Sequence, residues 1–110
     1  MTPSTELVKH PFIYEINTWP WLESISAAEG RAIDLGSVPA RYWDELGDLG
    51  FDAVWLMGVW QRSPAGIEIA LINSDLLASF TAALPDWREA DVVGSPYCIR
   101  DYIVDGHLGG

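Results

Sequence analysis

Phe51-Asp-Ala-Val-Trp-Leu-Met57 is the stretch that decides the predicted fold of this chain. Within it, Ala53–Met57 is a continuous apolar run with the length of an ordinary strand. Apolar side chains on both faces of a strand are typical of a parallel sheet that is covered on both sides. The run therefore predicts a buried parallel strand, and we expect Trp55 at its centre to belong to the core.

A helix and another strand are expected before this run. Ser37 is a candidate N-cap, Pro39 suits a first helical turn, and Gly50 is placed to end the helix with a left-handed residue. Earlier, Phe12-Ile-Tyr-Glu-Ile-Asn17 predicts a strand that Pro20 prevents from continuing. The order strand, helix, strand predicts a parallel βαβ unit and the α/β class. Since two parallel strands do not form a stable sheet alone, either the segments pair unusually or they are the front part of something larger.

Helical segments are expected after the run. Residues 58–66 predict a loop that holds Trp60. Apolar residues then recur at helical spacing: Ile69, Ile72, Leu76, Phe80 and Leu84. Asn73-Ser74-Asp75 predicts a break into two helices, with Ser74 or Asp75 as the cap of the second, and Pro85 ends it. Residues 86–93 predict a turn or a short helix.

Composition limits the partners and the compartment. Sixteen acidic against six basic residues give a net charge of −10, which repels nucleic-acid backbones and anionic membranes, so neither is expected as a partner. No apolar stretch approaches the roughly 18 residues of a membrane helix. Residues 1–9 are polar and lack the apolar run of a signal peptide, so we expect a flexible leader and a cytoplasmic protein. Cys98 is the only cysteine, which excludes a disulfide within the chain.

Three segments, in order along the chain, resemble those of the α-amylase superfamily, glycoside hydrolase family 13. Residues 12–17 are similar to the family's first barrel strand, and Leu46-Gly-Asp-Leu-Gly-Phe-Asp-Ala-Val-Trp-Leu56 resembles its second-strand pattern L-x-x-L-G-[FV]-[DT]-A-[IV]-W-L. Tyr97-Cys-Ile-Arg-Asp-Tyr102 is similar to its Tyr-x-x-x-Asp-Tyr segment. Residues 104–109 resemble the continuation [VI]-[ND]-P-x-[LF]-G, with Gly106 where proline is common. The resemblance runs from about residue 10 to residue 110.

The resemblance implies part of a catalytic domain. Since the family's (β/α)8 barrel takes about 250 residues, residues 10–110 are expected to form its first two βα units and the long loop after strand two, a partial TIM barrel. The implied activity is retaining hydrolysis or transfer at α-glucosidic bonds, with an α-glucan or oligosaccharide as partner. The family's nucleophile Asp, acid/base Glu and further Asp lie on later strands, and their motifs do not occur before Gly110. We therefore expect no catalytic residue here, no activity of this piece alone, and self-association through open sheet edges.

The resemblance also implies residues that contact substrate. Tyr97 matches the tyrosine that stacks on the sugar beside the scissile bond, and a loop at the C-terminal end of a barrel strand suits such a ring. Asp101 matches the aspartate that braces this loop by hydrogen bonds. Trp60, after strand two, is a further candidate for the cleft or else a packing residue. Gly94 stands where exo-acting members often carry an acidic residue, which leaves an endo-acting hydrolase or a transferase open.

No metal or cofactor is expected from this chain. His10, His107 and Cys98 match no zinc spacing. No dense Asp/Asn loop indicates calcium, although calcium is common in complete members of the family. The residues leave one alternative of another class: a non-enzymatic acidic module that binds carbohydrate or protein through a surface rich in tryptophan, of which the chain has six.

Overall fold

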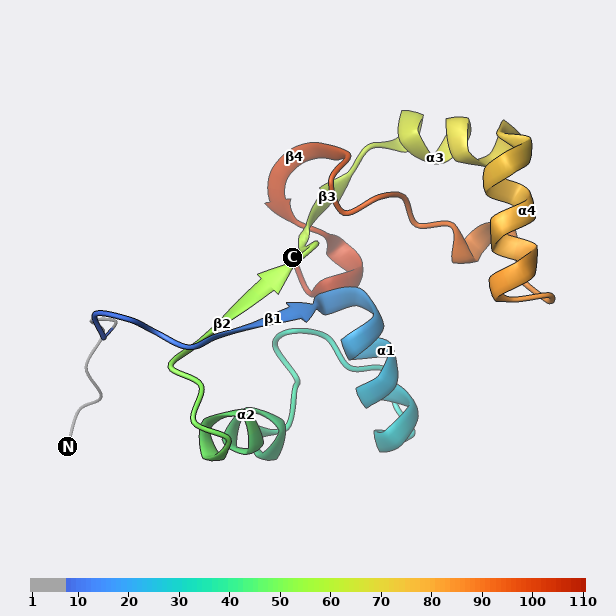
Figure 1. Ribbon diagram of the computed structural model, residues 1–110. Coiled ribbons are helices and arrows are strands. Elements are labelled where there is room, and N and C mark those ends of the chain that lie inside the picture. The colour runs from blue at the N-terminus through green and yellow to red at the C-terminus, as the bar shows by residue number, and fades with distance from the viewer. Residues whose placement is uncertain (1–7) are drawn as a thin grey trace. The chain divides into compact units, whose positions relative to one another are not determined.

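The computed structural model describes residues 8–110, so most of the expected leader, residues 1–7, lies outside the described part. The chain divides into two compact units (Figure 1). Unit 1 holds the residues up to Met57 together with His107–Gly109, and unit 2 holds Gly58–Gly106 with Gly110. The chain therefore leaves unit 1 after Met57 and re-enters it at His107, which makes unit 2 an insertion in the sequence of unit 1.

Unit 1 contains the predicted βαβ unit. Strand β1 (Ile13–Asn17) pairs in parallel with β2 (Ala53–Met57), with Ile13 opposite Ala53 and Asn17 opposite Met57. Helices α1 (Thr18–Glu29) and α2 (Ala40–Asp48) connect the two strands. Figure 1 shows β1 and β2 side by side, with α1 beginning directly where β1 ends. The α/β class is confirmed, and within residues 8–110 the strands form two small sheets and no closed barrel.

The helix boundaries in unit 1 follow proline and glycine. Pro20 lies in the first turn of α1, where a missing N–H is tolerated, so the expected stop of β1 is confirmed. Pro39 is the N-cap residue of α2, and the predicted cap Ser37 is wrong: its hydroxyl instead accepts a 3.0 Å hydrogen bond from the Asp34 N–H. Gly50 has φ of +92° just past α2, as predicted.

The core of unit 1 is small, and β2 is not buried on both faces as predicted. Trp55 is 54% exposed, so its expected place in the core is wrong. The buried apolar side chains instead come from β1, α1, the segment after α1 and the returning chain: Ile16, Leu22, Ile25, Ile33 and Leu108. The physical reason is that β2 has β1 as its only strand neighbour in the described residues, so neither its free edge nor much of its surface is covered.

Unit 2 contains a short antiparallel sheet and two helices. Strand β3 (Trp60–Arg62) pairs with β4 (Ile99–Val104). The sequence predicted loops at both positions, so this pairing was not expected. Helices α3 (Pro64–Ile72) and α4 (Ser74–Ala83) confirm the predicted break into two, and the short 3-10 helix η1 (Glu89–Asp91) confirms the turn expected after Pro85. A second 3-10 turn, η2 (Gly106–Leu108), leads back to unit 1. The predicted cap of α4, Ser74 or Asp75, is wrong. Asn73 is the cap, because its side chain accepts a 3.1 Å hydrogen bond from the Leu76 N–H.

In the part of the chain that the structure describes, no single helix is long and apolar enough to cross a membrane. Helices α3 and α4 reach that length and composition only when taken together, and the chain bends by 86° between them.

Candidate functional site

Tyr97 lies in a tight turn of unit 2 that precedes β4. The Cys98 N–H donates to the Ser95 carbonyl at 3.1 Å, and the Tyr97 N–H donates to the Ser95 hydroxyl at 3.2 Å. The Cys98 carbonyl in turn accepts a 2.8 Å hydrogen bond from the Ser63 N–H. We name residues 94–98 the Tyr97 loop. Its backbone is fixed by these bonds, while the Tyr97 ring is 77% exposed and makes no aromatic ring contact with any described residue.

Arg62, at the end of β3, joins the Tyr97 loop to the turn after β2. Its Nη1 donates a 2.8 Å hydrogen bond to the Gly94 carbonyl, and its Nη2 donates a 3.2 Å bond to the Gly58 carbonyl. The residue is only 8% exposed. Burial lowers the pKa of the guanidinium, and the charge of Asp105 partly offsets that change. Arginine stays protonated at any physiological pH, so it remains a donor in this position.

The two glycines that Arg62 contacts allow the chain to pass close to it. Gly94 has φ of +88°, and a Cβ atom there would lie 3.1 Å from Ile67 Cγ1. Gly58 has φ of +78°, and a Cβ there would lie 3.0 Å from both Arg62 Nη2 and Pro96 Cβ. Only glycine adopts these φ values at low cost and leaves this space free. Gly94 stands where the family resemblance implies an acidic residue in exo-acting enzymes. The backbone conformation at this position itself requires glycine.

Trp60 lies on β3 rather than in the predicted loop. Its ring meets Tyr102 of β4 edge to face, with ring centroids 5.8 Å apart and an interplanar angle of 71°. Trp60 is 37% exposed and Tyr102 is 76% exposed. The pair therefore packs across the β3–β4 sheet and still presents aromatic surface to solvent. This surface is a second place in unit 2 where an apolar sugar face could stack.

Asp101 lies on β4, opposite Gln61 of β3. Its carboxylate is exposed and lies 3.7 Å from Nε of the neighbouring Arg100, and its side chain makes no hydrogen bond within residues 8–110. The brace that the structure does describe for the Tyr97 loop is Arg62. Nothing in the sequence pattern marks a buried arginine at this position, because it follows Trp60 and Gln61 in a stretch without clear alternation.

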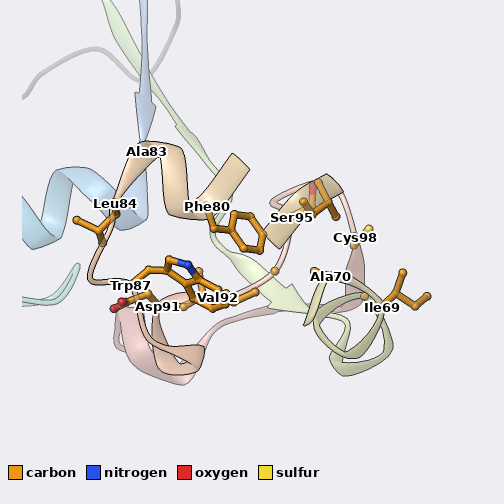
Figure 2. Close-up of a pocket in the computed structure, with 14 residues that line it drawn as sticks. Ile69, Ala70, Phe80, Ala83, Leu84, Trp87, Asp91, Val92, Ser95 and Cys98 are labelled. Atoms are coloured by element: carbon orange, nitrogen blue, oxygen red, sulfur yellow. The ribbon is translucent and has the colours of Figure 1, made fainter. Parts of the chain in front are cut away.

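Unit 2 also holds an apolar pocket of about 620 Å³ between α3, α4 and residues 87–98. Figure 2 shows its aromatic wall, where the Phe80 and Trp87 rings meet edge to face. Their centroids are 5.5 Å apart, and the interplanar angle is 71°. The Trp87 indole N–H donates to the Thr81 hydroxyl at 2.9 Å, which leaves its ring face to the pocket. Of the polar groups in the wall, the Asp91 carboxylate accepts a 2.7 Å bond from the Arg88 N–H.

The pocket and the sequence-predicted residues are separate. Gly94, Ser95 and Cys98 line the pocket, but Tyr97 and Trp60 do not. Part of the Tyr97 loop therefore lines the pocket, although the Tyr97 ring does not. The pocket offers few polar groups to orient a sugar. Among the described residues, no group of three or more His, Cys, Asp or Glu side chains is arranged to hold a metal ion.

The chain was compared with models of protein families, with curated proteins and with solved structures, and each comparison gave no match.

Proposed function

We propose that this chain is the N-terminal part of the catalytic domain of an α-amylase-like glycosidase or transglycosylase. In this proposal β1 and β2 are the first two strands of a (β/α)8 barrel, and unit 2 is the long loop after strand two. One observation supports it most. The chain leaves the parallel β1–β2 pair after Met57, folds as a separate unit, and returns to the same unit at His107.

The return of the chain is well defined in unit 1. Leu108 is 2% exposed, and its carbonyl accepts a 2.9 Å hydrogen bond from the Leu35 N–H. The His107 ring lies 5.3 Å from the Trp19 ring. In a βα barrel the loop after a strand must bring the chain back beside the sheet before the next helix begins. Residues 107–109 follow unit 2 in the sequence and belong to unit 1, as the proposed connection requires.

The proposed role of this part is to bind sugar rather than to break bonds. Tyr97 supplies an exposed ring on a hydrogen-bonded loop, on which the C–H face of a glucose ring stacks. Trp60 and Tyr102 supply a second aromatic surface. The retaining reaction needs two carboxyl groups about 5–5.5 Å apart, one as nucleophile and one as acid/base. The proposal assigns both to later strands of the barrel and gives Asp101, whose carboxylate is exposed beside Arg100, no catalytic role.

The reading frame tests this proposal before any assay. We define the gene product as the protein encoded by the complete reading frame that contains residues 1–110. The proposal expects the frame to continue past Gly110 and to encode an Asp-x-x-x-Asn-His motif within about 40 residues, the span of one βα unit. A stop codon directly after Gly110 would favour the alternative, a non-enzymatic acidic module that binds carbohydrate or protein.

Activity then tests the reaction class. The gene product should release reducing sugar from maltoheptaose, and the isolated residues 1–110 should release none above background. Dextran, whose main chain is α-1,6-linked, and cellohexaose, which is β-1,4-linked, serve as substrates that report the linkage. A gene product that carries the motif but cleaves only the β-linked sugar would overturn the proposal.

A further inference from the structure

We propose that Arg62 is the positioning residue of the sugar site, which holds the Tyr97 loop in the conformation that presents the Tyr97 ring. This inference rests on the proposed function, because it concerns the same ring. It adds a residue that the sequence pattern did not indicate. The two hydrogen bonds from Arg62 to the Gly94 and Gly58 carbonyls carry it.

The first step concerns what would happen to the loop without the side chain. Gly94 is the first residue of the Tyr97 loop, and its carbonyl accepts the shorter of the two Arg62 bonds, at 2.8 Å. The described hydrogen bonds within the loop, from the Tyr97 and Cys98 N–H groups, both end on Ser95. These local bonds shape the turn, but they do not attach it to β3. Arg62 and the Ser63–Cys98 backbone bond make that attachment on the two sides of Tyr97.

The second step concerns why the residue is arginine. A guanidinium carries five N–H donors in a rigid plane, so one side chain donates to two carbonyls in different directions. An ammonium at the end of a lysine is a compact charge without that fixed fork. Arg62 is also nearly buried, so a carbonyl that loses its donor there is not readily compensated by water. Lysine at this position should therefore leave at least one of the two carbonyls less well held.

The third step connects the loop to the sugar. The Tyr97 ring is largely exposed and makes no aromatic ring contact with the described residues. The orientation of the ring therefore depends on the backbone of the Tyr97 loop. A stacking ring contributes only when its plane meets the sugar face, and small misplacements of positioning groups reduce rates strongly. Arg62 thus acts on the substrate through Tyr97 and does not touch it.

The test uses Arg62→Lys in the gene product, with Arg100→Lys as the matched control. Arg100 lies on the neighbouring β4, is exposed, and keeps a cation beside Asp101 after the substitution. Hydrogen–deuterium exchange is followed by mass spectrometry in peptides that cover residues 94–98 and, as a reference, α2 in unit 1. Arg62→Lys should speed exchange in residues 94–98 and leave α2 unchanged. Arg100→Lys should change neither.

A double-mutant cycle gives the second readout. With maltoheptaose as substrate, Arg62→Lys should lower kcat/KM by about ten-fold, within the range that misplaced groups cost. In a Tyr97→Ala background the same substitution should have almost no further effect, because the ring through which it acts is gone. Full additivity of the two losses would overturn the inference, since Arg62 would then act elsewhere.

The outcomes separate this inference from the proposed function. If the gene product does not turn over maltoheptaose, the proposed function fails, and hydrogen exchange alone decides whether Arg62 holds the loop. If turnover occurs and Arg62→Lys changes neither exchange nor kcat/KM, the inference fails and the proposed function stands. Should Arg62→Lys unfold the protein, Arg62→Gln is the second variant. Global unfolding by both would make Arg62 a general folding residue and overturn the positioning role.

Discussion

Arg62 and Gly94, 32 residues apart in the sequence, are joined by a 2.8 Å hydrogen bond from the guanidinium Nη1 to the glycine carbonyl. The bond ties the end of β3 to the start of the loop that carries Tyr97. Its donor, Arg62, is nearly buried, and its acceptor, Gly94, has a backbone conformation that favours glycine. The local structure around Tyr97 therefore depends on two residues outside the ring itself, Arg62 and Gly94.

Gly94→Ala should destabilise unit 2. The backbone at residue 94 has φ of +88°, which alanine adopts only at a cost. An added Cβ would also lie 3.1 Å from Ile67 Cγ1. The expected loss in the free energy of unfolding is about 1–3 kcal/mol, the usual cost of a side chain in a sparsely populated backbone region. Urea unfolding monitored by tryptophan fluorescence measures it.

Gly47→Ala is the control for this glycine. Gly47 lies inside α2, and a Cβ there meets nothing within 4 Å. Alanine should therefore stabilise the protein by about 0.5–1 kcal/mol, the helix preference of alanine over glycine. Equal effects of the two substitutions would contradict the description of the Gly94 backbone.

Asn73→Ala should weaken the start of α4. The Asn73 side chain accepts the Leu76 N–H at 3.1 Å, and loss of such a cap costs about 1 kcal/mol. Ser74→Ala is the control, because the sequence predicted Ser74 or Asp75 as the cap and the structure gives that role to Asn73. Urea unfolding of both variants should show the larger loss for Asn73→Ala. The reverse order would move the cap back to Ser74.

The isolated residues 1–110 should self-associate through the β1–β2 sheet. Phe12 is 72% exposed, Ile13 and Trp55 are each 54% exposed, and the outer edges of both strands have no partner strand in the described part of the chain. Open apolar edges favour pairing with other chains. Sedimentation velocity at rising concentration should show oligomers. Val54→Lys should shift them toward monomer, whereas Ser79→Lys, on the exposed surface of α4, should not. A concentration-independent monomer would contradict this prediction.

The local elements of this chain were predictable because local patterns determine them. The apolar run Ala53–Met57 and the aromatic strand before Pro20 gave the two parallel strands, and Asn73-Ser74-Asp75 gave the break between α3 and α4. The burial of β2 was not predictable in the same way. An apolar strand predicts that other elements will cover both of its faces. Trp55 is 54% exposed, so the described neighbours of β2 do not cover it in this way.

The candidate site was predictable only in part. The sequence indicated Tyr97 as a candidate, and its ring is exposed, but the sequence did not indicate Arg62 or the pairing of β3 with β4. Both depend on contacts between residues more than thirty positions apart, and the short strand β3 has irregular register with β4. Pattern and propensity describe neighbours in sequence, so contacts of this kind do not appear in them.

The central claim, that Tyr97 is a sugar-stacking ring, is tested most directly by kcat/KM of the gene product for maltoheptaose. Tyr97→Ala should lower kcat/KM by about ten-fold, the equivalent of roughly 1.4 kcal/mol of lost stacking. Tyr97→Phe keeps the ring and should retain most of the activity. Phe12→Ala, a comparably exposed aromatic of unit 1, should have little effect. Wild-type kcat/KM in Tyr97→Ala would contradict the account.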